Sequence, residues 1–406
     1  MKTSIAIIGG GPSSLMLASA LNESFFDVTI YDHNSALGRK FLVAGDGGFN
    51  LTHSEDVESF ISRYTPSDYL ENCFRFFNNN DLQTWLKRIG IDTFIGSSKR
   101  VFPLKNIKPI QVLNAFLNEL KTKHVQIKTK HEWKGWNQHH DLVFEHNTHL
   151  INITADIIVF GLGGASWSKT GTDGTWTRYF ENQSIKIIPF QPSNCGYLIK
   201  WQETFIHQAE GKPLKNITVS CHGKQKKGEI IITKFGIEGG AIYALSPQIR
   251  EKLTASNTAT VFIDLKPSST IEVILSKLQA PGHQSVTERL KKQLNFTELQ
   301  ISLLKSIVSK DDYTNAEKLA TLIKALPLSI YGMVPIEEAI SSVGGIDLSE
   351  TDDNFQLKQL PNHYVIGEML NWDAPTGGYL LQACFSMGNY LGNHLNQVAY
   401  QRIINM

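Results

Sequence analysis

Glycine residues and one carboxylate near the start of the chain have the types and spacing that hold a nucleotide. Gly9 and Gly11 directly follow a short apolar run, and Asp32 closes a second apolar run at residues 28–31. Gly9 permits a tight turn, and Gly11 lets the backbone approach a pyrophosphate. A helix that begins near Pro12 directs free N–H groups and the positive end of its dipole at that phosphate. Asp32 lies where a carboxylate can accept hydrogen bonds from a ribose diol, so these residues predict a dinucleotide site.

The elements that must position these residues can be identified on either side of them. Residues 5–8 are apolar and suit a strand that is buried on both faces, and Leu15, Leu17 and Leu21 recur at helical spacing. Ser14 replaces the third glycine of G-x-G-x-x-G and is small enough for close packing of helix on strand. The motif alone matches many ordinary turns. Here strand, helix, second strand and acid fall in register, which predicts an α/β nucleotide-binding domain.

The segment after Asp32 is rich in glycine and carries two positive charges. Arg39 and Lys40 lie near the expected pyrophosphate, and Gly45 and Gly48 belong to a dense group of glycines before residue 55. A solvated basic turn is the plainer interpretation. The glycine density directly beyond the ribose-binding acid favours a loop that lines the cofactor.

Later segments of the chain return to the same place. Residues 157–160 form another expected strand, which runs into Gly163 and Gly164. A strand that ends in glycines is typical where backbone passes beside a bound cofactor. Trp133 follows a predicted strand at residues 125–130 and is expected near an adenine ring.

A second helix N-terminus is expected close to the end of the sequence. A last strand at residues 363–366 runs into Gly367 and Glu368, and a helix opens at Gly377–Gly378, before Tyr379. Its N–H groups and dipole would stabilise the negative charge of a reduced flavin near the N1–C2=O edge. The alternative is that the glycines only start a helix. Two such N-termini at opposite ends of the sequence suit an extended cofactor, which favours FAD over NAD.

No residue stands out as a general acid or base. His53, Tyr331 and Asp373 are polar residues in segments expected near the flavin, but a structural role is the commoner one for each. Trp167 could stack on the flavin or fill the core. Because the flavin supplies the redox chemistry, we expect a hydride to pass between a small organic substrate and flavin N5. No second glycine-rich fingerprint marks a nicotinamide domain, so NAD(P)H is expected only as a transient electron donor.

Composition limits the class of protein. The chain has 406 residues, of which 41% are hydrophobic and 19% charged, with a net charge of +1. This balance argues against a nucleic-acid surface, and the absence of a long apolar run argues against a membrane protein and predicts a cytoplasmic location. The four cysteines are scattered and are expected to be buried thiols. No metal site is indicated, and the oligomeric state is left open.

The length favours more than one domain. We expect a discontinuous nucleotide-binding domain at residues 1–190 and 345–406, interrupted by two inserted parts. Short strands with turns between them predict a small β unit at residues 191–267, and amphipathic helices predict a helical unit at residues 268–344.

Taken together, these residues resemble the bacterial BaiN-like flavoproteins, also known as the YhiN or HI_0933-like family. The similarity runs nearly from end to end. It is most specific in GRKFLVAGDGGFNLTHSE (38–55), GLGGASWSKTGTDG (161–174) and GEMLNWDAPTGGYLLQACFSMG (367–388). The resemblance implies an FAD-binding Rossmann-like domain of the glutathione-reductase type, with an inserted β-barrel-like unit and a helical unit.

The resemblance also implies contacts to FAD at Gly9, Gly11, Ser13, Ser14, Asp32, Arg39, Lys40, Gly367, Glu368, Gly378 and Gln382. The motif glycines and the residues that flank these positions complete the predicted cofactor-binding set: Pro12, His33, Gly45, Gly48, Asn50, Trp133, Gly163, Gly164, Asp373, Gly377, Tyr379 and Leu381.

Two departures from the family pattern limit what can be transferred. The family tends to carry G-G-R-C-N where this chain has Gly47-Gly48-Phe49-Asn50, so no Arg–Cys function is carried over. Many relatives have A-T-G-G where this chain has Gly161-Leu162-Gly163-Gly164, which removes a hydroxyl group near the flavin. The reactions of family members differ, so the resemblance does not imply a substrate.

The sequence therefore leads to three hypotheses of function. The first is an FAD-dependent oxidoreductase that acts on a small organic molecule. The second is a flavin-bound RNA-modifying or RNA-associated protein, which the neutral charge balance disfavours. The third is a flavin-binding regulator without turnover.

Overall fold

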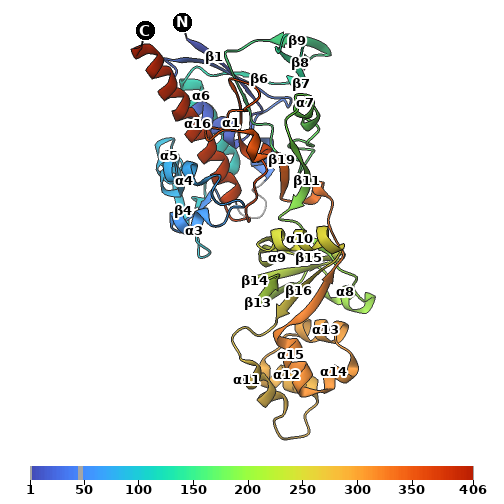
Figure 1. Cartoon of the computed structure of the whole chain (residues 1–406). Coiled ribbons are helices and arrows are strands. Elements are labelled where there is room, and N and C mark those ends of the chain that lie inside the picture. Colours follow the sequence, from blue (N-terminus) through green and yellow to red (C-terminus); the bar gives the residue numbers. More distant parts are fainter. Residues whose placement is uncertain (1, 44–48, 406) are drawn as a thin grey trace. The chain divides into compact units, whose positions relative to one another are not determined.

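The computed structural model describes residues 2–43 and 49–405. The chain divides into two compact units, one formed by Met1–Gln191 with Ser341–Met406 and the other by Pro192–Ile340. Figure 1 labels the elements of both.

A five-stranded sheet forms the centre of the first unit, in the order β20-β10-β1-β2-β6. All of its neighbouring strands are parallel. The strands are β1 (Thr3–Ile8), β2 (Phe26–Tyr31), β6 (Gln126–Lys128), β10 (Ile157–Phe160) and β20 (His363–Val365). The apolar run of β1 is buried because β1 lies in the middle of the sheet. This sheet confirms the predicted Rossmann-type α/β fold.

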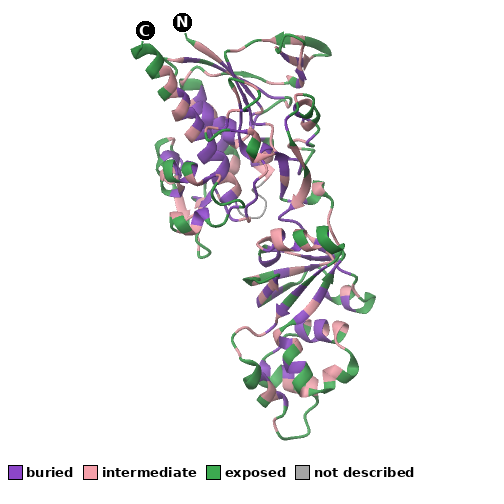
Figure 2. Cartoon of the chain, in the orientation of Figure 1, coloured by how far each residue is buried: buried purple, intermediate pink, exposed green. Residues whose placement is uncertain are grey.

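Two helices pack closely beside this sheet. Helix α1 (Pro12–Ala20) connects β1 to β2, and α16 (Tyr379–Ile404) lies against it. Figure 2 shows α1 and much of α16 as buried. A Cβ atom at Gly388 would lie 2.3 Å from the carbonyl oxygen of Ser13, and one at Gly392 would lie 2.7 Å from Cβ of Ala20. The two helices approach this closely because α16 has glycines where it crosses α1.

The remaining elements of the first unit surround this core. Two further three-stranded sheets have the orders β3-β5-β4 and β7-β8-β9, and β11 pairs with β19 where the chain leaves and re-enters the unit. The strands are β3 (Thr52–His53), β4 (Thr93–Ile95), β5 (Arg100–Pro103), β7 (Glu132–Trp136), β8 (Leu142–His146), β9 (His149–Ile153), β11 (Ile187–Ser193) and β19 (Ser341–Ile346). The helices are α2 (Arg39–Val43), α3 (Val57–Ile61), α4 (Glu71–Phe76), α5 (Asn79–Arg88), α6 (Pro109–Thr122) and α7 (Thr177–Glu181).

The second unit contains a seven-stranded sheet in the order β17-β16-β13-β14-β15-β12-β18. Its strands are β12 (Tyr197–Leu198), β13 (Pro213–Cys221), β14 (Lys224–Thr233), β15 (Gly236–Glu238), β16 (Ala259–Asp264), β17 (Leu326–Ile330) and β18 (Gly332–Met333). The two edge strands, β17 and β18, are consecutive along the chain, and only Tyr331 lies between them. A single connecting residue is too short to cover twice the distance between neighbouring strands, so the two edges must lie close together. The edges therefore meet at Tyr331, which makes the sheet barrel-like.

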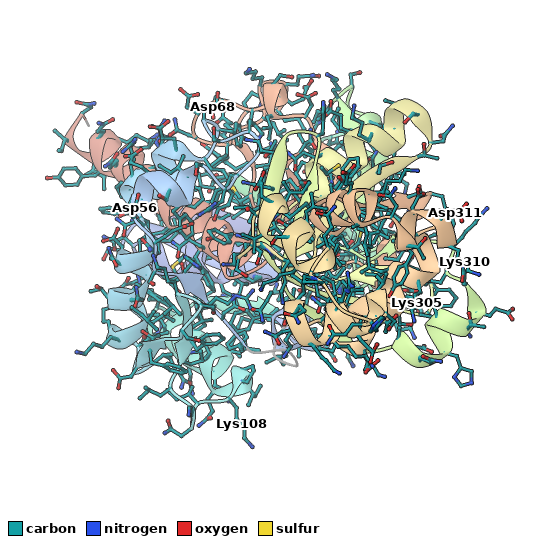
Figure 3. All side chains as sticks on the ribbon, turned by 90° about the horizontal axis from the view of Figure 1, so that it is seen from below. Asp56, Asp68, Lys108, Lys305, Lys310 and Asp311 are labelled. Carbon is teal, nitrogen blue, oxygen red and sulfur yellow. The ribbon has the colours of Figure 1, made fainter. Side chains whose placement is uncertain are left out.

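Helices cover parts of the second unit. They are α8 (Glu203–Ala209), α9 (Gly240–Tyr243), α10 (Ser246–Ser256), α11 (Ile271–Leu278), α12 (Val286–Leu294), α13 (Glu298–Ile307), α14 (Lys310–Thr314) and α15 (Ala316–Lys324). Figure 3 shows charged side chains of both signs, among them Lys305, Lys310 and Asp311, which are exposed on α13 and α14. The range 268–344, expected to be helical, also contains β17 and β18, which belong to the sheet.

Two sequence-based expectations can be compared with the described residues. All four cysteines are buried, as predicted. No helix within residues 2–43 and 49–405 is long and apolar enough to cross a membrane.

Candidate functional site

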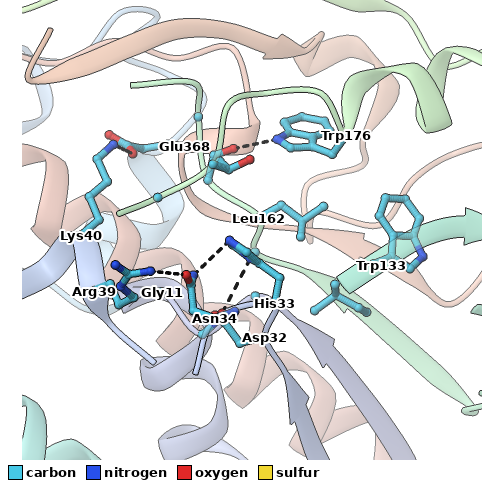
Figure 4. Close-up of a pocket in the computed structure, with 18 of the residues that line it drawn as sticks. Gly11, Asp32, His33, Asn34, Arg39, Lys40, Trp133, Leu162, Trp176 and Glu368 are labelled. Atoms are coloured by element: carbon cyan, nitrogen blue, oxygen red, sulfur yellow. Dashed lines mark hydrogen bonds and ion pairs between the residues drawn. The ribbon is translucent and has the colours of Figure 1, made fainter. Parts of the chain in front are cut away.

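A cavity opens where the carboxyl ends of β1, β2 and β10 meet the start of α1 (Figure 4). Ile8, Tyr31 and Gly161 line it at the ends of these three strands. In an open parallel sheet, ligands bind in a crevice at this edge. The fold therefore places the predicted nucleotide residues at the edge where such ligands bind.

The glycine loop after β1 passes close to the loop after β10. Gly9 has a φ of +96°, and a Cβ atom there would lie 2.4 Å from the carbonyl oxygen of Gly161. Gly11 is the N-cap residue of α1 and Pro12 is its first residue, and no side chain caps this helix end. Since the first turn of a helix leaves backbone N–H groups without helical partners, this end can bind a phosphate.

Asp32 is buried at the end of β2 and fixes the shape of the loop. Its Oδ2 accepts a hydrogen bond from the backbone N–H of Gly10 at 2.8 Å, and its Oδ1 accepts one from the N–H of Asn34 at 2.7 Å. His33 Nδ1 lies 3.7 Å from Oδ1. The carboxylate therefore holds the glycine loop against β2, and it also lines the cavity.

Two cations border the cavity on the side of α2. Arg39 donates a hydrogen bond to Asn34 Oδ1 at 2.6 Å. The ammonium group of Lys40 lies 2.9 Å from both Glu368 Oε2 and Ser166 Oγ. Figure 4 shows these side chains at one side of the cavity. They place positive charge beside the expected pyrophosphate.

Aromatic residues border another part of the cavity. Trp133 lines it, and its buried indole Nε1 has no hydrogen-bond partner among the described residues. Trp176 donates a hydrogen bond from its Nε1 to the carbonyl oxygen of Gly163 at 3.2 Å, and the guanidinium group of Arg178 lies over the ring of Tyr179 at 4.8 Å. Flat aromatic surfaces of this kind suit a purine ring.

The N-terminus of α16 has a strained backbone that only glycine tolerates well. Gly377 and Gly378 have φ values of +119° and +101°. A Cβ atom at Gly378 would lie 2.4–2.5 Å from backbone atoms of Thr52. This helix end is therefore pressed against β3, with no side-chain cap on its first turn.

A hydrogen-bonded network lies beside the same helix end. The hydroxyl of Tyr379 donates to Glu55 Oε1 at 2.6 Å, and Arg63 donates to both oxygens of Glu55 at 3.1 and 2.8 Å. The ring of His53 stacks on that of Tyr379, with centroids 5.2 Å apart.

This network determines the protonation of its members. Burial would raise the pKa of Glu55, but hydrogen bonds from Arg63 and Tyr379 outweigh it and lower that pKa. Burial and the neighbouring Glu55 carboxylate raise the pKa of Tyr379. Burial lowers the pKa of His53, and the nearby Arg63 and Arg100 lower it further, against the opposing effect of Glu55.

The structure places the predicted site residues in several groups. Those that line the cavity are Gly9, Gly11, Pro12, Ser13, Asp32, His33, Arg39, Lys40, Trp133, Gly163, Gly164 and Glu368. Those that do not line it are Ser14, Asn50, Gly367, Asp373, Gly377, Gly378, Tyr379, Leu381 and Gln382. Gly45 and Gly48 lie outside the described residues. Tyr331 belongs to the second unit and is exposed, and Trp167 is 40% exposed rather than a core residue.

Sequence reasoning missed several residues at the cavity. His131, Ser168, Thr172, Arg178 and Tyr179 line it, although none was among the predicted site residues. Ser166, which binds Lys40, was also missed. The segment GLGGASWSKTGTDG contains Ser168 and Thr172, so its polar residues were the available signal.

Comparisons with known proteins agree with this arrangement. A family model described as the HI0933-like protein Rossmann domain matches residues 3–394. A 3-dehydro-bile acid delta(4,6)-reductase from Clostridium scindens is 22% identical over 96% of this chain and 98% of that protein. A ribosomal RNA dihydrouridine synthase from Haemophilus influenzae is 22% identical over 94% of this chain and 95% of that protein. The solved 3-ketosteroid-delta4-(5alpha)-dehydrogenase from Rhodococcus jostii RHA1 shares the fold, with a TM-score of 0.53, 11% identity and coverage of 96% of both chains.

Proposed function

The chain belongs to the HI0933-like family, and from this premise we propose that it is an FAD-dependent oxidoreductase that transfers a hydride between a small organic substrate and flavin N5. The observation that carries the proposal is the cavity at the ends of β1, β2 and β10, where Gly9, Gly11 and Asp32 meet the N-terminus of α1. This arrangement suits the adenosine and pyrophosphate parts of FAD.

The residues present fit the cofactor. Buried polar atoms without partners are rare in folded proteins, and a bound ligand is one of the groups that can satisfy them. Trp133 Nε1 is one such atom at the cavity, and Thr52 Oγ1 and Gln382 Oε1 are two more next to the N-terminus of α16. A cofactor with an adenine at one end and a polar ring at the other would satisfy groups of both kinds.

Each part of the site then has a task. The loop from Gly9 to Ser13 and the start of α1 would hold the pyrophosphate, with positive charge from Arg39 and Lys40. Asp32 would hold the ribose. The first turn of α16 would face the flavin ring. When bound, the flavin supplies the group that gives or accepts the hydride.

The names of the two relatives support a proposal for the substrate class. Both names describe the saturation of a carbon–carbon double bond, in a 3-dehydro-bile acid and in a uridine of ribosomal RNA. A flavin hydride adds readily to such a bond when a carbonyl group conjugated with it can take up the electron pair. We therefore assign to this chain a substrate with a carbon–carbon double bond conjugated to a carbonyl group.

The electron donor is proposed to be NAD(P)H, which would bind transiently because the chain has no second glycine-rich fingerprint. Anaerobic stopped-flow mixing of the FAD-loaded protein with NADH and with NADPH tests this. We expect the flavin absorbance to bleach with one of them and to return when an enone is added. A flavin that stays oxidised with both nucleotides would contradict the proposed donor. A chain that takes up no FAD would contradict the proposed function itself.

A second candidate is the same chemistry on an RNA base, which the Haemophilus influenzae relative favours. Retention of the protein on immobilised ribosomal RNA that weakens with salt would support it. Elution at low salt, together with turnover of a small enone, would exclude it.

A further inference from the structure

Polar groups without partners gather around the first turn of α16. Thr52 and Gln382 are both fully buried, and among the described residues Thr52 Oγ1 and Gln382 Oε1 have no hydrogen-bond partner. The backbone of Thr52 contacts Gly378, and the N–H of Gln382 donates to the carbonyl oxygen of Gly378. Both residues therefore border the first turn of α16. The amide Nε2 of Gln382 is hydrogen-bonded to the carbonyl oxygen of Phe77 and to Ser386 Oγ, so Thr52 Oγ1 is the atom that a polar ligand at this turn would satisfy.

The pairing of β3 with β5 places the positively charged side chain of Arg100 beside this turn. His53 of β3 pairs with Arg100 of β5, next to the pair of Thr52 and Val101. A Cβ atom at Gly377 would lie 3.4 Å from Nε of Arg100. The guanidinium group of Arg100 thus lies beside the residue that precedes the helix N-cap.

This charge is not neutralised within residues 2–43 and 49–405. The side chain of Arg100 makes no hydrogen bond or ion pair with any of them. The neighbouring carboxylate, Glu55, is occupied by Arg63 and by the hydroxyl of Tyr379. The other titratable group facing Arg100 is His53, whose pKa is lowered first by burial and also by the charges of Arg63 and Arg100. His53 therefore adds no second charge at neutral pH.

We propose that Arg100 and the first turn of α16 together hold the negative charge that a flavin ring carries when it is reduced, and that Arg100 thereby raises the reduction potential of the flavin. The inference rests on the proposed function. Arg100 is partly buried and has no counter-ion among the described residues, so its charge is available to a ligand. A reduced flavin is a ligand of the opposite charge, and charge near its pyrimidine edge is one of the means by which a protein tunes it.

The proposal is tested with the FAD-loaded protein and three variants. Arg100→Met removes the charge and keeps much of the length of the side chain, whereas Arg100→Lys keeps the charge. Arg88→Gln is the matched control, because Arg88 is an exposed arginine of the same unit that pairs with Glu119 at 3.0 Å. Two quantities are measured: the reduction potential, by equilibration with reference dyes, and the dissociation constant of sulfite. Sulfite probes the same charge, because its sulfur lone pair forms a bond to N5 and an electron pair moves onto the N1–C2=O edge.

We expect Arg100→Met to lower the potential and to weaken sulfite binding by about tenfold or more, the effect of one nearby opposite charge on an ionising group. Arg100→Lys should remain near the wild-type protein, and Arg88→Gln should match it. Equal potentials and equal sulfite constants in the Met and Lys variants would overturn the proposal. If Arg100→Met fails to retain FAD, Arg100→Gln serves as the neutral variant, and a sulfite constant equal to that of Arg100→Lys would then overturn the proposal. Failure of the wild-type chain to bind FAD would instead refute the proposed function.

Discussion

Substitution of Gly388 by valine tests whether the contact between α1 and α16 supports the cofactor site. A Cβ atom at Gly388 would lie 2.3 Å from the carbonyl oxygen of Ser13 and 2.9 Å from the backbone nitrogen of Leu17. These are backbone atoms, so no side chain can rotate away. The helices would have to separate by about 1 Å to reach an ordinary contact.

The size of the effect follows from two opposing terms. Overpacking of this kind costs about 1–3 kcal/mol, and a clash with backbone falls at the upper end. Valine is a better helix former than glycine by a few tenths of a kcal/mol, which offsets little. A net loss of about 2–3 kcal/mol corresponds to a melting temperature lower by roughly 4–12 °C for a unit of this size.

The same displacement should weaken FAD binding. Ser13 lies in the first turn of α1, which faces the expected pyrophosphate, so a shift of its backbone misplaces the N–H groups of that turn. If the substitution destabilises the FAD-bound protein by about 1.4 kcal/mol more than the free protein, the dissociation constant of FAD rises tenfold.

Thermal unfolding with and without FAD gives the melting temperature, and a titration of FAD fluorescence gives the dissociation constant. Gly240→Val is the control, because a Cβ atom at Gly240 meets no heavy atom within 4 Å. A Gly388→Val protein that melts like the wild type and binds FAD equally well would refute the reasoning.

Three further outcomes are expected. Asp32→Asn should weaken FAD binding by roughly tenfold or more, because hydrogen bonds to a charged group are worth about 1.5–3 kcal/mol; Asp27→Asn, on the exposed side of the same strand, should not, and equal affinities of the two variants would contradict this role. Gly378→Leu should lower flavin occupancy or the reduction potential, since the left-handed φ and the backbone of Thr52 both oppose a side chain there; an unchanged redox titration would count against it. The ammonium group of Lys186, 2.6 Å away, lowers the pKa of Asp347 to about 2. The stabilisation from Asp347 is therefore complete above the ordinary carboxyl pKa and lost as pH falls toward 2. Urea unfolding should show Asp347→Asn less stable than wild type by about 1–2 kcal/mol at pH 7, with the difference shrinking below pH 4; a difference independent of pH would disprove the link.

The parts of the fold that depend on neighbouring residues could be predicted from the sequence. The apolar run before Gly9, the helix after Pro12 and the acid at Asp32 form one continuous segment, so local pattern and turn chemistry determine them. The predicted last helix is also present, with Gly378 at its N-cap. The first of these segments carries Gly9, Gly11 and Asp32, which all line the cavity.

The parts that depend on pairing between distant segments could not be predicted. Strand β17 begins only two residues after helix α15 ends, so the local pattern does not separate its residues from the predicted helical unit. The position of Arg100 beside Gly377 depends on the register of β5 against β3 and on the contact of β3 with α16. The ion pair of Lys40 with Glu368 joins residues that are far apart along the chain, so no local sequence pattern predicts it.

The meeting of β17 and β18 at Tyr331 has a consequence for biosynthesis. All seven strands of that sheet come from one uninterrupted stretch of sequence. The two strands at its edges, β17 and β18, are both formed by the last residues of that stretch. A nascent polypeptide that has emerged only as far as Lys324 therefore exposes the unpaired backbone groups of β16 and of β12 to pairing with other chains. Once residue 333 has emerged, β17 can pair with β16 and β18 with β12 in a single step. This happens before the ribosome has synthesised β20 and α16 of the other unit.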